Sequence, residues 1–280
     1  MTDGLIITLD NGESKITIGD ENCQFLLLEH DGFEAADYDV KTVTSGASDG
    51  VYISTHRLGE RTISIKFDYS WVGMEISRSK LIKFFSPNRN LNVIVDRRGT
   101  TREISGVASD FKIDESNLHE FSIVKVSILC PDPYFKSVDT VFRNSAVSKS
   151  AFHLPCKLPC IVGVQSGTGF VDVINDGDTY ADMVAELIVS APITAPYVYN
   201  RTNGKKIKIL DSLDAGDKVV ISTVRRAKKA TVNGERANID PTSVFSDFLE
   251  RGLNQIDYGS EDGSDMIAAN LTYTALYLGV

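Results

Sequence analysis

The last third of the chain is a succession of short β-forming runs separated by turn residues. Ala185–Val189 and Lys218–Ser222 are rich in β-forming residues, and turn residues gather at Asn175–Asp178, Asn203–Gly204 and Gly216–Asp217. Strands of about four to eight residues bounded by such turns are typical of a β-sandwich. No catalytic residue type is concentrated in this part of the sequence, so the pattern favours a structural or adhesive module over an enzyme.

The first half of the chain is also predicted to be rich in β-strands. Leu5–Leu9 and Lys15–Ile18 flank the turn sequence Asp10–Gly12, which indicates a hairpin. Arg61–Tyr69 alternates apolar and polar residues over its whole length, so one face of this strand should be buried. One helix is expected over Met74–Phe85, and the spacing places on one side of it Met74, Ser77, Leu81, Ile82 and Phe85.

A domain boundary is predicted where the strand pattern breaks. The segment Cys130–Phe135 contains Pro131 and Pro133, and proline cannot donate the hydrogen bond that a central strand needs. We therefore expect two mainly β domains, residues 1–137 and residues 138–280. In the second domain, Thr242–Leu249 is expected to form one short helical turn.

Charge and hydropathy argue against two classes of function. The chain has 280 residues and a net charge of −9, from 29 basic and 38 acidic side chains. Neither half is basic, which argues against sequence-independent binding of nucleic acid. No apolar run approaches the roughly 18 residues of a membrane helix, and the first residues lack the features of a secretory signal. We expect a protein made and folded in a cytosol, with no membrane partner.

Two groups of residues invite a metal site, and each has a simpler interpretation. His153 lies near Cys156 and Cys160, but a zinc site needs four ligands, and packed thiols at a Pro-rich domain entrance are the alternative. Asp172 and the pair Asp176 and Asp178 suit either a calcium ion or a polar hairpin turn. No P-loop, nucleophile elbow or His-Glu-x-x-His motif occurs. We expect no catalytic, cofactor-binding or metal-binding residue.

Short motifs follow one another along nearly the whole chain. In chain order they are Ile53–Ile65, Phe84–Pro87, Cys130–Phe135, Asn175–Asp178, Asn203–Gly204, Ala215–Asp217, Gly252–Tyr258 and Tyr277–Val280. In content and order they resemble the distal tail proteins of long-tailed bacteriophages or prophages, the Dit or Sipho-tail family. Their collinearity makes the resemblance specific.

The resemblance implies a structural virion protein rather than an enzyme. It implies an N-terminal ring-forming domain with one helix, which assembles into a homo-hexamer, and a C-terminal galectin-like β-sandwich outside the ring. The ring would lie at the virion tail tip, after synthesis in the bacterial host cytoplasm. Its partners would be the tail tube protein, the tail-associated hub protein and receptor-binding proteins. DNA would pass through the central channel without specific binding.

The candidate assembly interface is a loop followed by a strand. Thr44–Gly50 has small, polar residues that suit a flexible loop, and the strand Val51–His56 follows it. We expect this segment to add to a neighbour's sheet through Val51, Tyr52, Ile53 and Thr55. The alternative is an ordinary hairpin packed on its own domain.

Two rival functions use the C-terminal sandwich. A carbohydrate-binding adhesin would contact a glycan through Tyr197 and Tyr199, although packing within the domain is the simpler role for both. A glycan-cleaving enzyme would need a cleft with two carboxyl groups about 5–9.5 Å apart. For the ring, we expect a neutral or acidic channel wall, with Arg78, Lys80 and Lys83 facing elsewhere.

Overall fold

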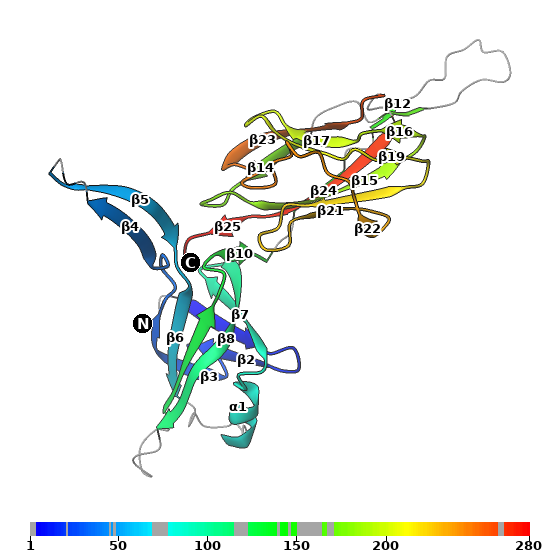
Figure 1. Cartoon of the computed structure of the whole chain (residues 1–280). Coiled ribbons are helices and arrows are strands. Elements are labelled where there is room, and N and C mark those ends of the chain that lie inside the picture. The colour runs from blue at the N-terminus through cyan, green and yellow to red at the C-terminus, as the bar shows by residue number, and fades with distance from the viewer. Residues whose placement is uncertain are drawn as a thin grey trace. The chain divides into compact units, whose positions relative to one another are not determined.

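The computed structural model describes residues 4–20, 22–44, 46, 49–68, 78–114, 123–138, 141–144, 147–149, 164–166, 171–262 and 266–280. These residues form a mainly β protein with one helix, which confirms the predicted fold class (Figure 1). The chain divides into two compact units, Met1–Val138 with Tyr277–Val280, and Asp139–Leu276. The last four residues therefore belong with the N-terminal unit, whereas the sequence-based division assigned them to the second domain.

The first unit is built on a closed sheet of antiparallel and parallel strand pairs. The strands follow one another in the order β8-β7-β1-β2-β3-β6-β9, and β8 also pairs with β9, which closes the barrel. Only β2 and β3 run parallel among these pairs. The barrel strands are β1 (Leu5–Asp10), β2 (Lys15–Gly19), β3 (Phe25–Asp31), β6 (Arg61–Asp68), β7 (Asn90–Arg97), β8 (Thr100–Asp114) and β9 (Ile123–Cys130). Two short strands, β10 (Phe135–Ser137) and β25 (Leu276–Tyr277), continue the sheet beyond β8.

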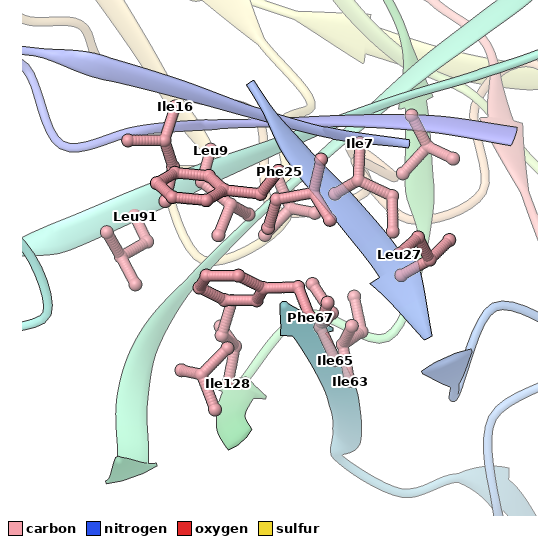
Figure 2. Close-up of a cluster of buried hydrophobic side chains, with 14 of the residues drawn as sticks. Ile7, Leu9, Ile16, Phe25, Leu27, Ile63, Ile65, Phe67, Leu91 and Ile128 are labelled. Atoms are coloured by element: carbon pink, nitrogen blue, oxygen red, sulfur yellow. The ribbon is translucent and has the colours of Figure 1, made fainter. Parts of the chain in front are cut away.

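Alternating apolar residues fill the barrel, as the sequence pattern predicts. Successive side chains of a strand point to opposite faces, so Ile7 and Leu9 of β1 point inward and are fully buried. The rings of Phe25 and Phe67 meet in this core with their centroids 5.0 Å apart (Figure 2). Burying each large apolar side chain contributes about 1.5–3 kcal/mol, so this cluster is the main source of stability of the unit.

The predicted helix is confirmed in part. Helix α1 spans Arg78–Phe84, and residues 69–77 lie outside the described residues. Leu81, Phe84 and Phe85 are buried, whereas Ile82 is 48% exposed. The assignment of Ile82 to the buried side was wrong, because positions three and four residues apart share a helix face and Leu81 already sets that face.

The second unit contains two larger sheets. One has the strand order β11-β24-β15-β20-β21-β22 and the other β14-β23-β17-β18. The first sheet consists of β11 (Val141–Asn144), β24 (Ile267–Thr274), β15 (Asp182–Val189), β20 (Lys218–Ser222), β21 (Lys229–Val232) and β22 (Glu235–Arg236). The second consists of β14 (Val171–Asn175), β23 (Gly252–Gly259), β17 (Tyr197–Asn200) and β18 (Lys205–Lys208). Two-stranded pairs are formed by β12 (Val147–Lys149) with β13 (Val164–Ser166), and by β16 (Ile193–Thr194) with β19 (Ser212–Leu213).

A shared core makes these two sheets a sandwich. Ala185 and Leu187 of the first sheet and Val198 and Ile256 of the second are fully buried in one hydrophobic cluster. Two facing sheets with a common apolar interior define a β-sandwich. A closer likeness to galectins stays a prediction.

The helical turn expected at Thr242–Leu249 is absent, and that expectation was wrong. The segment forms turns instead. Asp247 has a φ of 53°, and the next residues, Phe248 and Leu249, are buried in the core. The buried Asn200 amide also donates a hydrogen bond of 2.7 Å to the Phe248 carbonyl. Core packing therefore decides the local conformation here.

A buried arginine connects separate segments of the first unit. Arg61, at the start of β6, is only 2% exposed. Its guanidinium donates hydrogen bonds to the carbonyl oxygens of Pro133 at 2.8 Å, Gly32 at 2.7 Å and Leu278 at 2.5 Å, and also to that of Glu34. Burial lowers the pKa of this group, yet it stays charged, because arginine titrates far above neutral pH.

Replacing Arg61 should therefore be costly. Arg61→Met leaves four carbonyl oxygens without this donor, and each buried unsatisfied group costs about 1–3 kcal/mol. We expect a loss of at least about 3 kcal/mol in the free energy of unfolding, measured by urea denaturation. Arg57→Met is the matched control, since Arg57 is exposed and its ion pair with Asp39 should be worth at most about 1 kcal/mol. Equal losses in the two variants would contradict the role given to Arg61.

The buried thiol of Cys130 predicts a loss of stability at alkaline pH. Burial raises its pKa from the ordinary 9.0 to about 12. Between these values the unfolded chain loses the proton while the folded chain keeps it, so stability present below about pH 9 falls as pH rises. Cys130→Ala should show a shallower fall from pH 9 to 11 in thermal unfolding than the unchanged protein. Parallel curves would rule out this contribution.

Candidate assembly interface

A two-stranded arm extends from the barrel. Strands β4 (Tyr38–Thr44) and β5 (Val51–Leu58) form a sheet of their own and pair only with each other in the part of the chain that the structure describes (Figure 1). The register joins Tyr38 to Leu58 at the base and Thr44 to Val51 near the tip. Every residue of β5 from Val51 to Arg57 is exposed. We call this hairpin the arm.

The arm has one apolar face. Residues opposite each other in an antiparallel pair point to the same side, and side chains alternate along each strand. An unpaired residue, Ser54, lies at the register shift that follows Lys41, and its hydroxyl donates to the Lys41 carbonyl at 3.2 Å. With this bulge, the register places on one side Tyr38, Val40, Val51, Ile53 and Leu58, which we call the apolar arm face.

The other arm face is polar toward the base. Asp39 lies opposite Arg57 and Lys41 opposite Thr55. The Arg57 Nε is 2.8 Å from the Asp39 carboxylate, and this hydrogen bond lowers the pKa of that carboxyl. Toward the tip this face carries Val43 opposite Tyr52, so the arm is amphipathic at its base and apolar on both sides near its tip. Neither face is covered by another described element.

Such exposure is unusual for a monomer. Tyr38 is 68% and Ile53 65% exposed, and Val51 is 56% exposed. An isolated two-stranded hairpin is marginally stable in water, and contiguous exposed apolar groups mark interaction sites. The arm therefore has the properties of a segment that becomes covered on assembly.

The base of the arm is well anchored. The Gly59 N–H donates to the Asp37 carbonyl at 2.8 Å, which ties the two strands together where they leave the barrel. Gly32 adopts a φ of 85°, and a Cβ there would lie 2.2 Å from the Thr62 carbonyl oxygen. Only glycine fits this position, and its carbonyl accepts from Arg61. The arm thus projects from a fixed base.

The structure places all four predicted interface residues on β5. Val51 and Ile53 lie on the apolar arm face, whereas Tyr52 and Thr55 lie on the other face. The sequence analysis missed the contribution of β4. The apolar residues Tyr38 and Val40, two positions apart in a predicted strand, were the available signal.

The two tyrosines proposed for a glycan lie on the outer face of the four-stranded sheet. Tyr197 and Tyr199 flank the buried Val198 of β17 and are partly exposed. The Lys206 ammonium lies 4.0 Å from the Tyr197 ring centroid, so part of that ring is already occupied. Burial raises the pKa of the Tyr197 hydroxyl. This geometry offers little stacking surface at Tyr197, and a glycan contact there stays a prediction.

The other sequence-based candidates can be placed only in part. Asp172, Asp176 and Asp178 lie at and after β14, and no group of three metal-ligating side chains occurs within the described ranges. The segment holding His153, Cys156 and Cys160 lies outside the described residues. Within the described residues, no helix is both long enough and apolar enough to span a membrane.

Comparison with known proteins identifies a class. Residues 176–277 match the family model of the Siphovirus-type tail component, C-terminal domain. No curated protein sequence matches the chain. Residues 176–277 therefore resemble a phage tail component domain, and the predicted resemblance to the distal tail family is confirmed for this part of the chain.

Solved structures extend the likeness to the whole fold. The crystal structure of the Dit protein (gp 19.1) of phage SPP1 has a TM-score of 0.66 at 13% identity, covering 96% of this chain and 98% of that chain. That protein is described as a paradigm of the hub adsorption apparatus in phages that infect Gram-positive bacteria. A phage P2 baseplate structure in its activated conformation with Ca matches at 9% identity, 97% and 98% coverage, and a TM-score of 0.48. The SPP1 match shows a shared fold.

Proposed function

We propose that this protein is a distal tail component of a long-tailed phage and assembles with copies of itself into a ring of six subunits. The ring would join the tail tube protein to the tail-associated hub protein and to receptor-binding proteins at the virion tail tip. Its channel would let DNA pass without specific binding. The protein would have a structural role and no enzymatic activity.

The exposed apolar arm face carries this proposal. A ring needs a heterologous contact, in which one surface of each subunit binds a different surface of the next. An arm that projects from a fixed base supplies one of these surfaces at a distance from its own barrel. The match to a tail component domain and the fold shared with SPP1 Dit support the setting in a phage tail.

Ring closure would stabilise a weak pairwise contact. Burying a large apolar side chain contributes about 1.5–3 kcal/mol, but those of the apolar arm face are already partly covered, Leu58 most of all, so each contributes less. Ordering the contact also costs free energy. Each subunit of a closed ring makes two such contacts, so we expect assembly to be cooperative and dependent on concentration.

A charge on the apolar arm face should prevent assembly. For Ile53→Asp we expect a monomer by light scattering and no rings by negative-stain microscopy, because the new carboxylate would have to be buried. Ile188→Asp places the same charge at an exposed isoleucine of β15 in the second unit and should leave the ring intact. Thr55→Asp, on the polar face, should have a smaller effect than Ile53→Asp.

Two results would contradict the role of the arm. One is a chain lacking residues 45–56 that still forms the same ring. The other is an Ile53→Asp protein that assembles with the concentration dependence of the unchanged protein.

The channel wall should be neutral or acidic. A basic wall would hold DNA by releasing counterions, which opposes its passage. Arg78, Lys80 and Lys83 are exposed on α1, and we expect them to face subunit contacts or the outer solvent. A cryo-electron microscopy map of the assembled ring is the measurement. Placement of these three side chains along the channel would contradict the prediction.

A further inference from the structure

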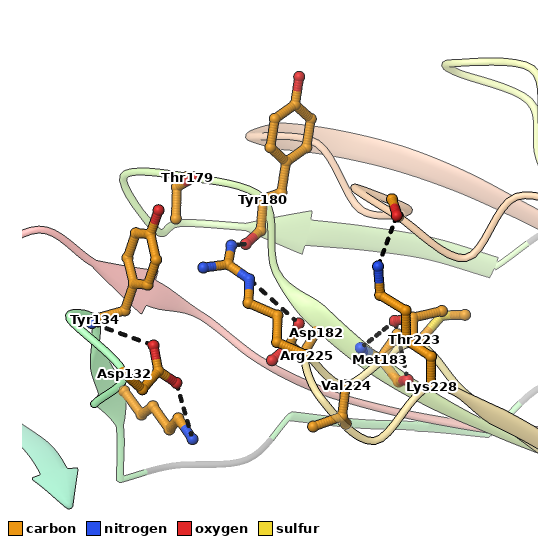
Figure 3. Close-up of polar contacts among 12 residues, drawn as sticks. Asp132, Tyr134, Thr179, Tyr180, Asp182, Met183, Thr223, Val224, Arg225 and Lys228 are labelled. Carbon is orange, nitrogen blue, oxygen red and sulfur yellow. Dashed lines mark hydrogen bonds and ion pairs between the residues drawn. The ribbon is translucent and has the colours of Figure 1, made fainter. Parts of the chain in front are cut away.

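A pocket of about 230 Å³ lies in the second unit where loops of the sandwich meet. Tyr180 lies just before β15 and Asp182 at its start, and Arg225 and Lys228 lie in the connection between β20 and β21 (Figure 3). Asp247 comes from the loop before β23. These residues are far apart in the sequence, and the fold brings them to one concave surface.

Hydrogen bonds hold the pocket walls in place. Thr223, only 3% exposed, accepts a hydrogen bond of 2.9 Å from the Met183 N–H. The Arg225 Nη2 donates to the Tyr180 carbonyl at 3.2 Å, and its Nε lies 3.9 Å from the Asp182 carboxylate (Figure 3). The pocket is therefore formed before any ligand arrives.

The pocket lies in a basic region of an acidic protein. The connection Val224–Lys229 contains Arg225, Arg226, Lys228 and Lys229, whereas the chain as a whole has a net charge of −9. A further cation, Lys205, donates to the Asp247 carbonyl at 2.7 Å and lies 5.4 Å from the Tyr180 ring centroid. Two of these five cations, Arg225 and Lys228, line the pocket and balance its two lining carboxylates, Asp182 and Asp247. The other three belong to its immediate surroundings and give them an excess of positive charge, which attracts an anion.

We propose that this pocket binds a phosphate group carried on a sugar or polyol, presented singly or as one unit of an anionic surface polymer. The Lys228 ammonium donates a hydrogen bond of 2.6 Å to the neutral Ser246 hydroxyl rather than to a carboxylate. Lysine and arginine are the usual partners of phosphate oxygens. The Tyr180 ring, 40% exposed, offers an apolar surface to the carbon skeleton of the ligand.

The size of the pocket limits the ligand to one unit. Pockets for drug-sized molecules measure roughly 300–1,000 Å³, and this one is smaller. High affinity for a polymer would then come from several subunits of an assembly binding several units at once. The binding itself is a property of a single chain and does not depend on the ring.

The test is a calorimetric titration of the full chain with glycerol phosphate, a glycerol phosphate oligomer, inorganic phosphate, glucose and a short single-stranded DNA. We expect glycerol phosphate to bind with a Kd of about 1 mM and glucose not to bind. Lys228→Gln should weaken glycerol phosphate about tenfold, the usual effect of losing one charged hydrogen bond. Lys206→Gln, which removes the same charge on the outer sheet face, should leave the Kd unchanged.

Further titrations identify the chemical source of the binding. Tyr180→Ala should weaken glycerol phosphate more than inorganic phosphate, because only the former has carbon atoms to contact the ring. An oligomer that binds better than glycerol phosphate would indicate a polymer as the ligand. The proposal is overturned if glycerol phosphate shows no saturable binding or if glucose binds equally well. It is also overturned if DNA binds as tightly as glycerol phosphate and Lys206→Gln weakens binding as much as Lys228→Gln does.

Discussion

The buried guanidinium of Arg61 joins the separate segments that surround the barrel core of the first unit. A charge removed from water must be compensated by hydrogen bonds, and here neutral carbonyl groups supply them. Those carbonyls belong to Gly32 and Glu34 before the arm, Pro133 before β10, and Leu278 after β25. Losing one acceptor weakens the solvation of the charge, so these segments stabilise one another.

This arrangement relates the arm to both connections with the second unit. The arm begins at Tyr38 and ends at Leu58, a few residues from the Gly32–Glu34 acceptors and from Arg61 itself. The chain leaves the first unit after Val138 and returns at Tyr277, close in sequence to the other two acceptors. The acceptors of Arg61 therefore lie near the base of the arm and, along the chain, near both connections.

The sequence predicted what depends on local pattern and missed what depends on distant partners. Alternation in β1 and β6 identified buried strand faces, and Pro131 and Pro133 marked the change of pattern. The same alternation showed Arg61 only as a charged strand residue, because its acceptors lie up to 217 positions away. The pocket was missed for a similar reason, since its lining comes from separate loops, although the basic run Val224–Lys229 was a visible signal.

Closure of the barrel limits how the arm can bind a neighbour. Strand addition needs a free edge, and pairing of β8 with β9 leaves few among the seven barrel strands, chiefly where β2 and β3 extend beyond their two-residue pairing. Side-chain packing is the other way in which a neighbouring barrel can receive the arm, and the apolar arm face is suited to it. The outer edges of β4 and β5 can still form main-chain hydrogen bonds, so the arm of one subunit can pair with the arm of another. The bulge at Ser54 disrupts the ladder of β5, which makes the edge of β4 the better candidate for such pairing.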